Sequence, residues 1–308
     1  MKRTTSLLIL FVLLFTSCAQ TQPSEPHKPL LVASHSILAY VADRIGGGHF
    51  QVESFVPDGV DSHSYQPTPQ DVARISLAKV VVLNGFGFEP YMSDLLPEAG
   101  SDLTIITATE GISPRIADGH AHEGESSTIE ATEPDPHFWL DPILVKQSAF
   151  TISAALAKID PQNAAEYQKN AKDFGEEMDQ LDTWIVEKTT SIPSSKRLIV
   201  TNHETLGYFA DRYGFSLAGS VLEGSSSEAA ASSQHLRELI SLIEERKISV
   251  IFIEPTDNPT VAEQIAQEAG VRLEKGLSTH GLVIDGKSVS YSEMMRRNVE
   301  LLCGVAGN

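Results

Sequence analysis

The chain has 308 residues, of which 41% are apolar, so it is long enough to build one large or two medium domains with a sizeable core. Its 41 acidic and 23 basic side chains give a net charge of −18. Such a chain offers no basic face that could neutralise phosphates, which argues against a nucleic-acid partner. An acidic surface is compatible with a protein that handles cations.

The first 18 residues, MKRTTSLLILFVLLFTSC, have the pattern of a secretory signal: two basic residues, an apolar run, then small residues. The apolar run is too short for a membrane-spanning helix. Small residues directly before Cys18 resemble a bacterial lipobox, although Phe15 stands where Leu is usual. We therefore expect Cys18 to be acylated; the alternative is an ordinary signal peptide cut a few residues later. Both interpretations place the mature protein outside the cytoplasm.

Residues 19–29, AQTQPSEPHKP, are polar and rich in proline and predict a tether between the anchor and the folded body. Runs rich in Val, Ile and Leu then alternate with helical patterns. Continuous apolar runs such as KVVVLN and SVIFIE are typical of strands buried on both faces of a parallel sheet. The pattern predicts an α/β fold with two (β/α)4-type lobes, 30–159 and 194–308. The expected strands are 30–34, 50–56, 79–84 and 102–107, then 197–202, 215–222, 249–254 and 271–277.

Two segments interrupt this alternation. Residues 111–136 have no clear period and contain DGHAHEGESSTIEATE, which predicts an acidic surface loop. Residues 160–193 carry one apolar stripe at helical spacing, which predicts a single long helix of about 45 Å between the lobes. Such a helix would act as a strut and restrict hinge motion. Gly175 would weaken it by up to about 1 kcal/mol without breaking it.

The chain contains only two cysteines, Cys18 and Cys303. Cys18 is either acylated or removed with the signal, so we expect no disulfide. Cys303 lies in the apolar run NVELLCGVAG near the end of a helical pattern. The simplest interpretation is a buried core thiol.

Several of the ten histidines have ordinary explanations. His27 lies in the tether. His49 follows a glycine turn and His235 lies in a polar helical pattern, so we expect both to be solvated. His35 follows the first strand, where capping or packing is its expected use.

Four other histidines follow predicted strands, two from each lobe: His63, His137, His203 and His280. Ligands bind outside the carboxyl ends of strands in open parallel sheets, so these side chains should converge on a cleft between the lobes. Neutral imidazoles suit a transition-metal cation best. Prolines before His137 fix an extended approach to it, and the Phe-Trp-Leu run that follows is expected to anchor it by packing. The pattern predicts a metal site.

The chain resembles the metal-binding solute-binding proteins of bacterial ABC importers, of the zinc, manganese and iron type. The resemblance covers nearly the whole mature chain. PDGVDSHSYQPTPQDVARISLAKVVVLNGFGFEPY matches the first-ligand segment, with His63, and DPHFWLDP the second, with His137. LIVTNHETLGYFADRYGF matches the third, with His203, and YSEMMRRNVELL matches the C-terminal helix of that family.

This resemblance implies a two-lobed binding protein, not an enzyme, that captures one divalent metal ion and delivers it to a membrane permease with its ATPase. It implies a location in the periplasm or on the outer face of the cell membrane, with the lipid anchor at Cys18. We expect a monomer. The loop histidines His120 and His122 resemble, in a minimal form, the metal-gathering loops of zinc-type members; a plain solvated loop is the equal alternative.

The fourth ligand departs from the family pattern, which commonly has an Asp in the loop before the last helix. This chain has LSTHGLVIDGKSVSYSEMM there, with Ser278 and Thr279 near the expected place and His280 adjacent. His280 is the favoured ligand. The alternatives are a water molecule or a carboxylate such as Glu254; Asp285 lies further along the loop.

With at least three imidazoles, the predicted site favours Zn²⁺ over manganese, which prefers oxygen ligands; manganese and ferrous iron are the alternatives. A different class of protein, a secreted zinc hydrolase, also uses three histidines and a water. Against this alternative, no HExxH motif is present. Glu204 beside His203 could be proposed as a base, but adjacent residues in a strand-to-helix turn tend to point apart. Nothing in the residues argues for adhesion to a host surface.

Overall fold

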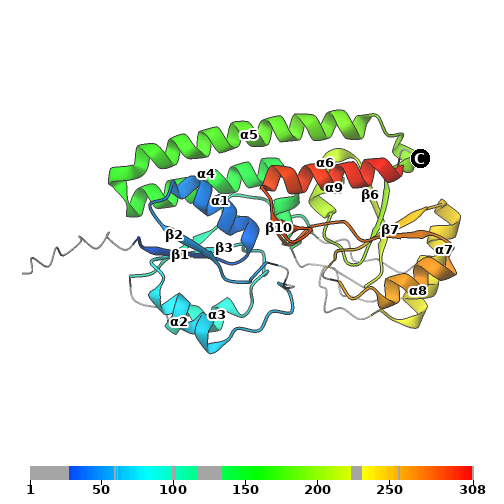
Figure 1. The fold of residues 1–308 in the computed structure, drawn as a ribbon, viewed down its shortest axis with the longest axis horizontal. Helices are drawn as coiled ribbons and strands as arrows, with labels where there is room; N and C mark the ends of the chain where they lie inside the picture. The colour runs from blue at the N-terminus through cyan, green and yellow to red at the C-terminus, as the bar shows by residue number, and fades with distance from the viewer. Residues whose placement is uncertain are drawn as a thin grey trace, which may run out of the picture.

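The structure is a computed structural model that describes residues 28–58, 60, 62–98, 102–116, 134–222, 231–255 and 257–306. The expected signal segment with Cys18, most of the tether, and the loop histidines His120 and His122 lie outside these residues. Figure 1 shows two lobes side by side, with a layer of long helices packed along both of them.

The N-terminal lobe contains a four-stranded parallel sheet in the order β2-β1-β3-β4. Its strands are β1 (Leu30–Ala33), β2 (Gln51–Ser54), β3 (Val80–Leu83) and β4 (Thr104–Thr107). The helices of this lobe are α1 (Ser36–Gly46), α2 (Pro69–Leu77) and α3 (Met92–Leu95), followed by the 3-10 turn η1 (Leu96–Glu98). Strands β1 and β3 are almost entirely buried, as continuous apolar runs predict for the central strands of a parallel sheet.

The C-terminal lobe repeats this order, as β6-β5-β7-β8, with all strands parallel. Its strands are β5 (Leu198–Thr201), β6 (Ser216–Ser220), β7 (Val250–Phe252) and β8 (Arg272–Glu274). The 3-10 turn η4 (Ser194–Lys196) precedes β5, and the helices are α6 (Gly207–Tyr213), α7 (Ser233–Arg246) and α8 (Thr260–Glu268). A small hairpin, β9 (Val283–Ile284) with β10 (Lys287–Ser288), leads into α9 (Tyr291–Ala306). All eight predicted sheet strands are therefore present, whereas the hairpin was not predicted.

The linking helix is α5 (Ala164–Thr190), about 40 Å long at 1.5 Å per residue. It begins four residues later than expected, after the 3-10 turn η3 (Pro161–Asn163). Helix α4 (Pro142–Ile159), which was not predicted, runs beside α5, and α1 and α9 also pack on α5 (Figure 1). The apolar stripe of α5 is buried almost as predicted, at Tyr167, Ala171, Phe174, Met178, Leu181 and Ile185.

One buried apolar cluster runs through both lobes and the helical layer. It includes Leu31 of β1, Phe174 of α5, Phe209 of α6 and Met294 of α9. Helix α5 is continuous through Gly175, where an added Cβ would lie only 3.3 Å from the Phe150 ring of α4. The two helices therefore approach closely at this glycine, and the shared core ties the lobes to one rigid layer.

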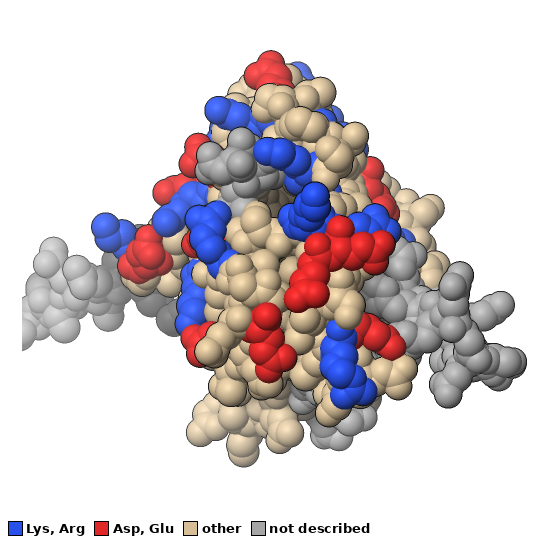
Figure 2. Space-filling model, turned by 90° about the vertical axis from the view of Figure 1, so that its right-hand side faces the viewer, with Lys and Arg blue, Asp and Glu red and all other residues tan. Residues whose placement is uncertain are grey.

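In the described part of the chain, no helix combines the length and the apolar character needed to cross a membrane. Figure 2 looks onto the end formed by the C-terminal lobe, where basic and acidic side chains lie among uncharged ones. The described part of this face carries no continuous field of either sign.

Candidate metal site

The first two candidate ligands come from the N-terminal lobe. His63 lies in the segment between β2 and α2, five residues before Thr68, which caps α2. His137 precedes the 3-10 turn η2 (Phe138–Leu140), whose three side chains are completely buried. The Asn84 side chain after β3 donates a hydrogen bond to the Pro136 carbonyl at 3.0 Å. Packing on one side and this bond on the other fix the position of the His137 ring.

The other two candidates come from the C-terminal lobe. His203 follows β5. The Thr201 hydroxyl donates a hydrogen bond to the His203 carbonyl at 2.7 Å, which stabilises the turn after this strand. His280 lies in the segment between β8 and the β9–β10 hairpin. The turn around His280 is held by the Asn298 side chain of α9, which accepts a hydrogen bond from the Ser278 N–H at 3.0 Å.

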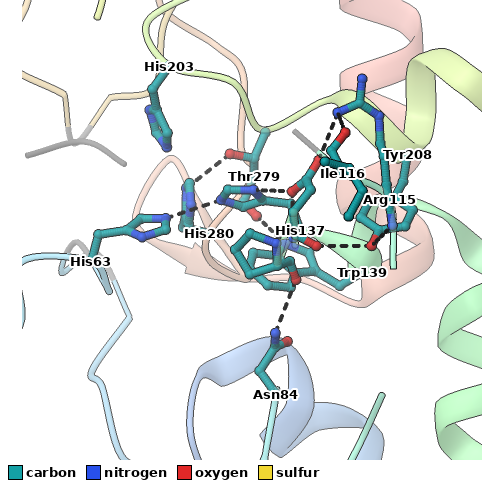
Figure 3. A network of polar contacts seen from close by, with 12 residues as sticks. His63, Asn84, Arg115, Ile116, His137, Trp139, His203, Tyr208, Thr279 and His280 are labelled. Atoms are coloured by element: carbon teal, nitrogen blue, oxygen red, sulfur yellow. Dashed lines mark hydrogen bonds and ion pairs between the residues drawn. The ribbon is translucent and has the colours of Figure 1, made fainter. Parts of the chain in front are cut away.

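The structure brings all four predicted side chains together. One ring nitrogen from each of His63, His137, His203 and His280 lies within 4.8 Å of the others. Figure 3 shows His63 and His137 meeting His203 and His280, so each lobe contributes two rings. His137 and His203 are buried, whereas His63 and His280 are half-buried and form the more open side of the cluster.

The atoms that face the centre of this cluster fit a cation. The Nε2 atoms of His63 and His137 are only 3.1 Å apart, and two neutral rings can share at most one proton there. The Nε2 atom of His203 is buried and has no hydrogen-bond partner among the described residues. A buried nitrogen normally has a partner, and a transition-metal ion can accept lone pairs from several imidazoles at once.

A carboxylate supports His137 from behind. The Asp135 Oδ1 atom is 2.8 Å from His137 Nδ1 and also accepts the His137 backbone N–H at 3.0 Å. Burial raises the pKa of Asp135 to about 6, against the opposing effects of the His137 N–H and of Arg115. Burial also lowers the pKa of His137 well below 6.5, and His280 adds to that shift. At pH 7 the ring is therefore neutral, and Asp135 accepts its Nδ1 proton and leaves Nε2 to face the cluster.

His280 has a similar partner in the other lobe. Glu254 lies two residues after the end of β7, and its Oε1 atom is 2.7 Å from His280 Nδ1. Burial alone would raise the pKa of Glu254, but His280 and the hydrogen bonds from Thr279 lower it to about 2. Burial, together with the His280 and His137 rings, lowers the pKa of His203 well below 6.5. The His137 and His203 rings are thus neutral at pH 7, and the cluster is backed by one carboxylate from each lobe.

The two carboxylates weighed as alternatives to His280 lie outside the cluster. Glu254, considered as a direct ligand, contacts His280 from behind and is not a member of the cluster. Asp285 is mostly exposed and pairs with Arg297 at 3.0 Å, also outside the cluster. The sequence reasoning missed Asp135 as the partner of His137; its position two residues before that histidine was the available signal.

The remaining histidines give mixed results. His35 is buried, with its ring 4.6 Å from that of Trp139, as expected for a packing role. The expectation that His235 is solvated is wrong, because its ring is buried and its Nε2 lies 2.8 Å from the Ser220 carbonyl at the end of β6. His49 is half-buried and pairs with Glu166 at 3.0 Å. Cys303 is half-buried and packs against the core.

Comparison with known proteins adds independent information. Residues 31–303 match the family described as "ZnuA: Zinc-uptake complex component A periplasmic". A solved structure, that of a manganese-bound point mutant of a periplasmic metal-binding protein from Candidatus Liberibacter asiaticus, superposes with a TM-score of 0.78 at 26% identity. The match covers 91% of this chain and all of that one.

Curated relatives carry names that refer to different metals. The manganese-binding lipoprotein MntA of Halalkalibacterium halodurans is 29% identical over 95% of this chain and 94% of its own length. The zinc-binding protein TroA of Treponema pallidum is 31% identical over 74% of this chain and 70% of its own length. The iron-binding protein YfeA of Yersinia pestis is 31% identical over 82% of this chain and 78% of its own length.

Proposed function

This chain belongs to the family of metal-binding substrate-binding proteins of ABC importers, and we propose that its cargo is a single zinc ion. Members of this family are binding proteins and not enzymes, and the comparisons give no support to the alternative of a zinc hydrolase. The proposed ligands are four imidazole nitrogens, from His63, His137, His203 and His280.

The observation that carries the choice of zinc is the composition of the cluster. Four ring nitrogens lie within 4.8 Å of one another, and no carboxylate oxygen belongs to the group among the described residues. Imidazole suits zinc, whereas manganese favours carboxylate, carbonyl and water oxygens. The names of the relatives include manganese, zinc and iron, so the donor set of this chain supports the choice more directly than its relatives do.

The same proposal covers the cellular role. The chain would collect zinc in the periplasm or on the outer face of the cell membrane, held there as a monomer by a lipid on Cys18. It would hand the ion to a membrane permease driven by its ATPase. The family description "periplasmic" and the word "lipoprotein" in the names of several relatives support this location.

A competition experiment tests the choice of metal. Purified metal-free protein is given equimolar zinc and manganese, desalted, and analysed for bound metal. We expect one zinc ion per chain and almost no manganese, and we expect zinc to displace manganese that was loaded first. Retention of manganese in the presence of equimolar zinc would contradict the proposal.

A further inference from the structure

Glu254 is the most completely engaged carboxylate near the cluster. It is buried and lies two residues after the end of β7, which pairs with the end of β5, two residues before His203. Its Oε2 atom accepts the Thr279 N–H at 3.0 Å, and its Oε1 atom accepts the Thr279 hydroxyl. His280 Nδ1 lies 2.7 Å from Oε1, and the His280 backbone N–H lies 3.4 Å from Oε2.

These contacts determine which nitrogen of His280 carries the proton. An ionised carboxylate only accepts hydrogen bonds, so the atom facing it must supply a proton. His280 Nδ1 therefore carries the hydrogen in the neutral ring. The lone pair then resides on Nε2, on the opposite side of the ring, and is available to a metal ion.

The two carboxylates behind the cluster differ in their charge balance. Asp135 lies 3.5 Å from the guanidinium of Arg115, which offsets its charge. Glu254 forms no ion pair with any Lys or Arg in the described part of the chain. A buried carboxylate without a cation is costly, and hydrogen bonds alone offset only part of that cost. A divalent cation held on the far side of the His280 ring would supply the remaining charge.

We propose that Glu254 is the positioning residue that makes His280 a metal ligand and that it thereby directs the site toward zinc. Its carboxylate hydrogen-bonds to the far side of the imidazole and makes that ring a stronger nitrogen ligand. No oxygen of the carboxylate contacts the ion itself. A carboxylate bound directly would attract manganese, whereas one placed behind a histidine strengthens a nitrogen ligand that zinc prefers. This inference rests on the proposed function, because it concerns the same ion.

The first test needs neither a variant nor a metal. Nitrogen-15 NMR of the metal-free protein at pH 7.5 distinguishes the two neutral tautomers of each histidine. We expect the His280 ring to carry its proton on Nδ1. A proton found on Nε2 would overturn the assignment, whether or not the protein binds zinc.

The second test is a double-mutant cycle on zinc affinity. In Glu254→Gln, one of the two oxygens becomes an NH₂ group. At the Oε1 position it would face His280 Nδ1, and at the Oε2 position it would face two backbone N–H groups, so either orientation opposes a donor to a donor and weakens the support of the His280 ring. We expect zinc affinity to fall by about 10–100-fold, the usual loss for an outer-shell partner of a metal ligand. His280→Ala should show a similar loss, and the double variant should bind no more weakly than His280→Ala alone.

Comparison of the double variant with the two single variants shows whether Glu254 acts by positioning His280 or only through its negative charge. A negative charge that acted on the ion directly would still act without His280, so the two losses would then add in full and overturn the inference. Parent-like affinity of Glu254→Gln would also overturn it. Asp285→Asn is the matched control, because it removes one acidic charge from the turn between β9 and β10, outside the cluster, and it should bind like the parent.

The outcomes distinguish this inference from the proposed function. If the parent chain retains no zinc, the proposed function fails, while the tautomer of His280 still decides the role of Glu254 in the metal-free site. If the parent binds zinc and Glu254→Gln binds equally well, only this inference fails. If Glu254→Gln does not fold, the tautomer measured in the parent decides.

Discussion

The indole N–H of Trp139 donates a hydrogen bond to the backbone carbonyl of Thr279 at 2.6 Å, across the boundary between the two lobes. Trp139 lies two residues after His137, and Thr279 directly precedes His280. The Tyr291 hydroxyl of α9 donates in turn to the Trp139 carbonyl at 2.7 Å. One completely buried side chain therefore sets the distance between a candidate ligand of each lobe (Figure 3).

Trp139→Phe should weaken this connection while keeping an aromatic ring in the core. The Thr279 carbonyl would lose its donor in a completely buried position, which costs about 1–3 kcal/mol. We expect the free energy of unfolding of the metal-free protein, measured in urea, to fall by that amount. Trp184→Phe on α5 is the control: Trp184 packs against Arg296 at the edge of the core, and its replacement should change stability less. Equal losses in the two variants would contradict the prediction.

Replacing His137 with Ala should reduce zinc affinity by more than the roughly 10–100-fold typical of outer-shell partners, because a direct ligand is lost. The rise in melting temperature on adding zinc should shrink in parallel, since stabilisation by a ligand follows its affinity. Calorimetric titration and thermal unfolding measure the two effects. His49→Ala serves as the control, because His49 pairs with Glu166 and is not a member of the cluster. An unchanged affinity in His137→Ala would remove His137 from the site.

His280→Asp should replace one imidazole of the cluster with a carboxylate. An oxygen ligand favours manganese, so the ratio of zinc to manganese affinity should decrease, while His280→Ala should lose zinc affinity without gaining manganese. Competition titrations of both variants against the parent measure that ratio. If neither variant changes it, His280 does not contact the ion.

The metal-free protein should lose stability as the pH falls below about 6.5. Burial lowers the pKa of His35 to about 3, against the opposing hydrogen bond with Asn84. Between these values the unfolded chain binds a proton that the folded chain does not, so acid favours unfolding by up to about 1.4 kcal/mol per pH unit for this group. His35→Gln should therefore show a shallower decrease in unfolding free energy between pH 7 and pH 5. Identical slopes for the variant and the parent would contradict the assigned cause.

Much of the fold could be predicted because buried parallel strands appear as short continuous apolar runs, whereas a packed helix shows an apolar stripe at helical spacing. The eight sheet strands and the buried face of α5 are confirmed. Helix α4 was missed, although the sequence carries a common start signal, an Asp followed by a Pro in the first turn. In the structure Asp141 accepts the Ile143 N–H and Pro142 occupies that turn. His235 was misjudged because the surroundings of a helix face depend on how the helix packs on the sheet.

The positions of the candidate ligands followed from topology, because each lies beyond the carboxyl end of a strand. The partners of these ligands depend on contacts between distant segments. Glu254 lies 26 residues before His280, and only the packing of adjacent strands brings the two together. Such pairs cannot be read from spacing, which is why the sequence alone left Glu254 open as a ligand.

In the proposed site, four imidazoles bind one zinc ion. X-ray absorption at the zinc edge of protein loaded with one equivalent of zinc measures this directly. We expect four nitrogen ligands at about 2.0–2.1 Å, with scattering that fits four imidazole rings and no oxygen. A spectrum that requires an oxygen ligand, or fewer than four imidazoles, would contradict it.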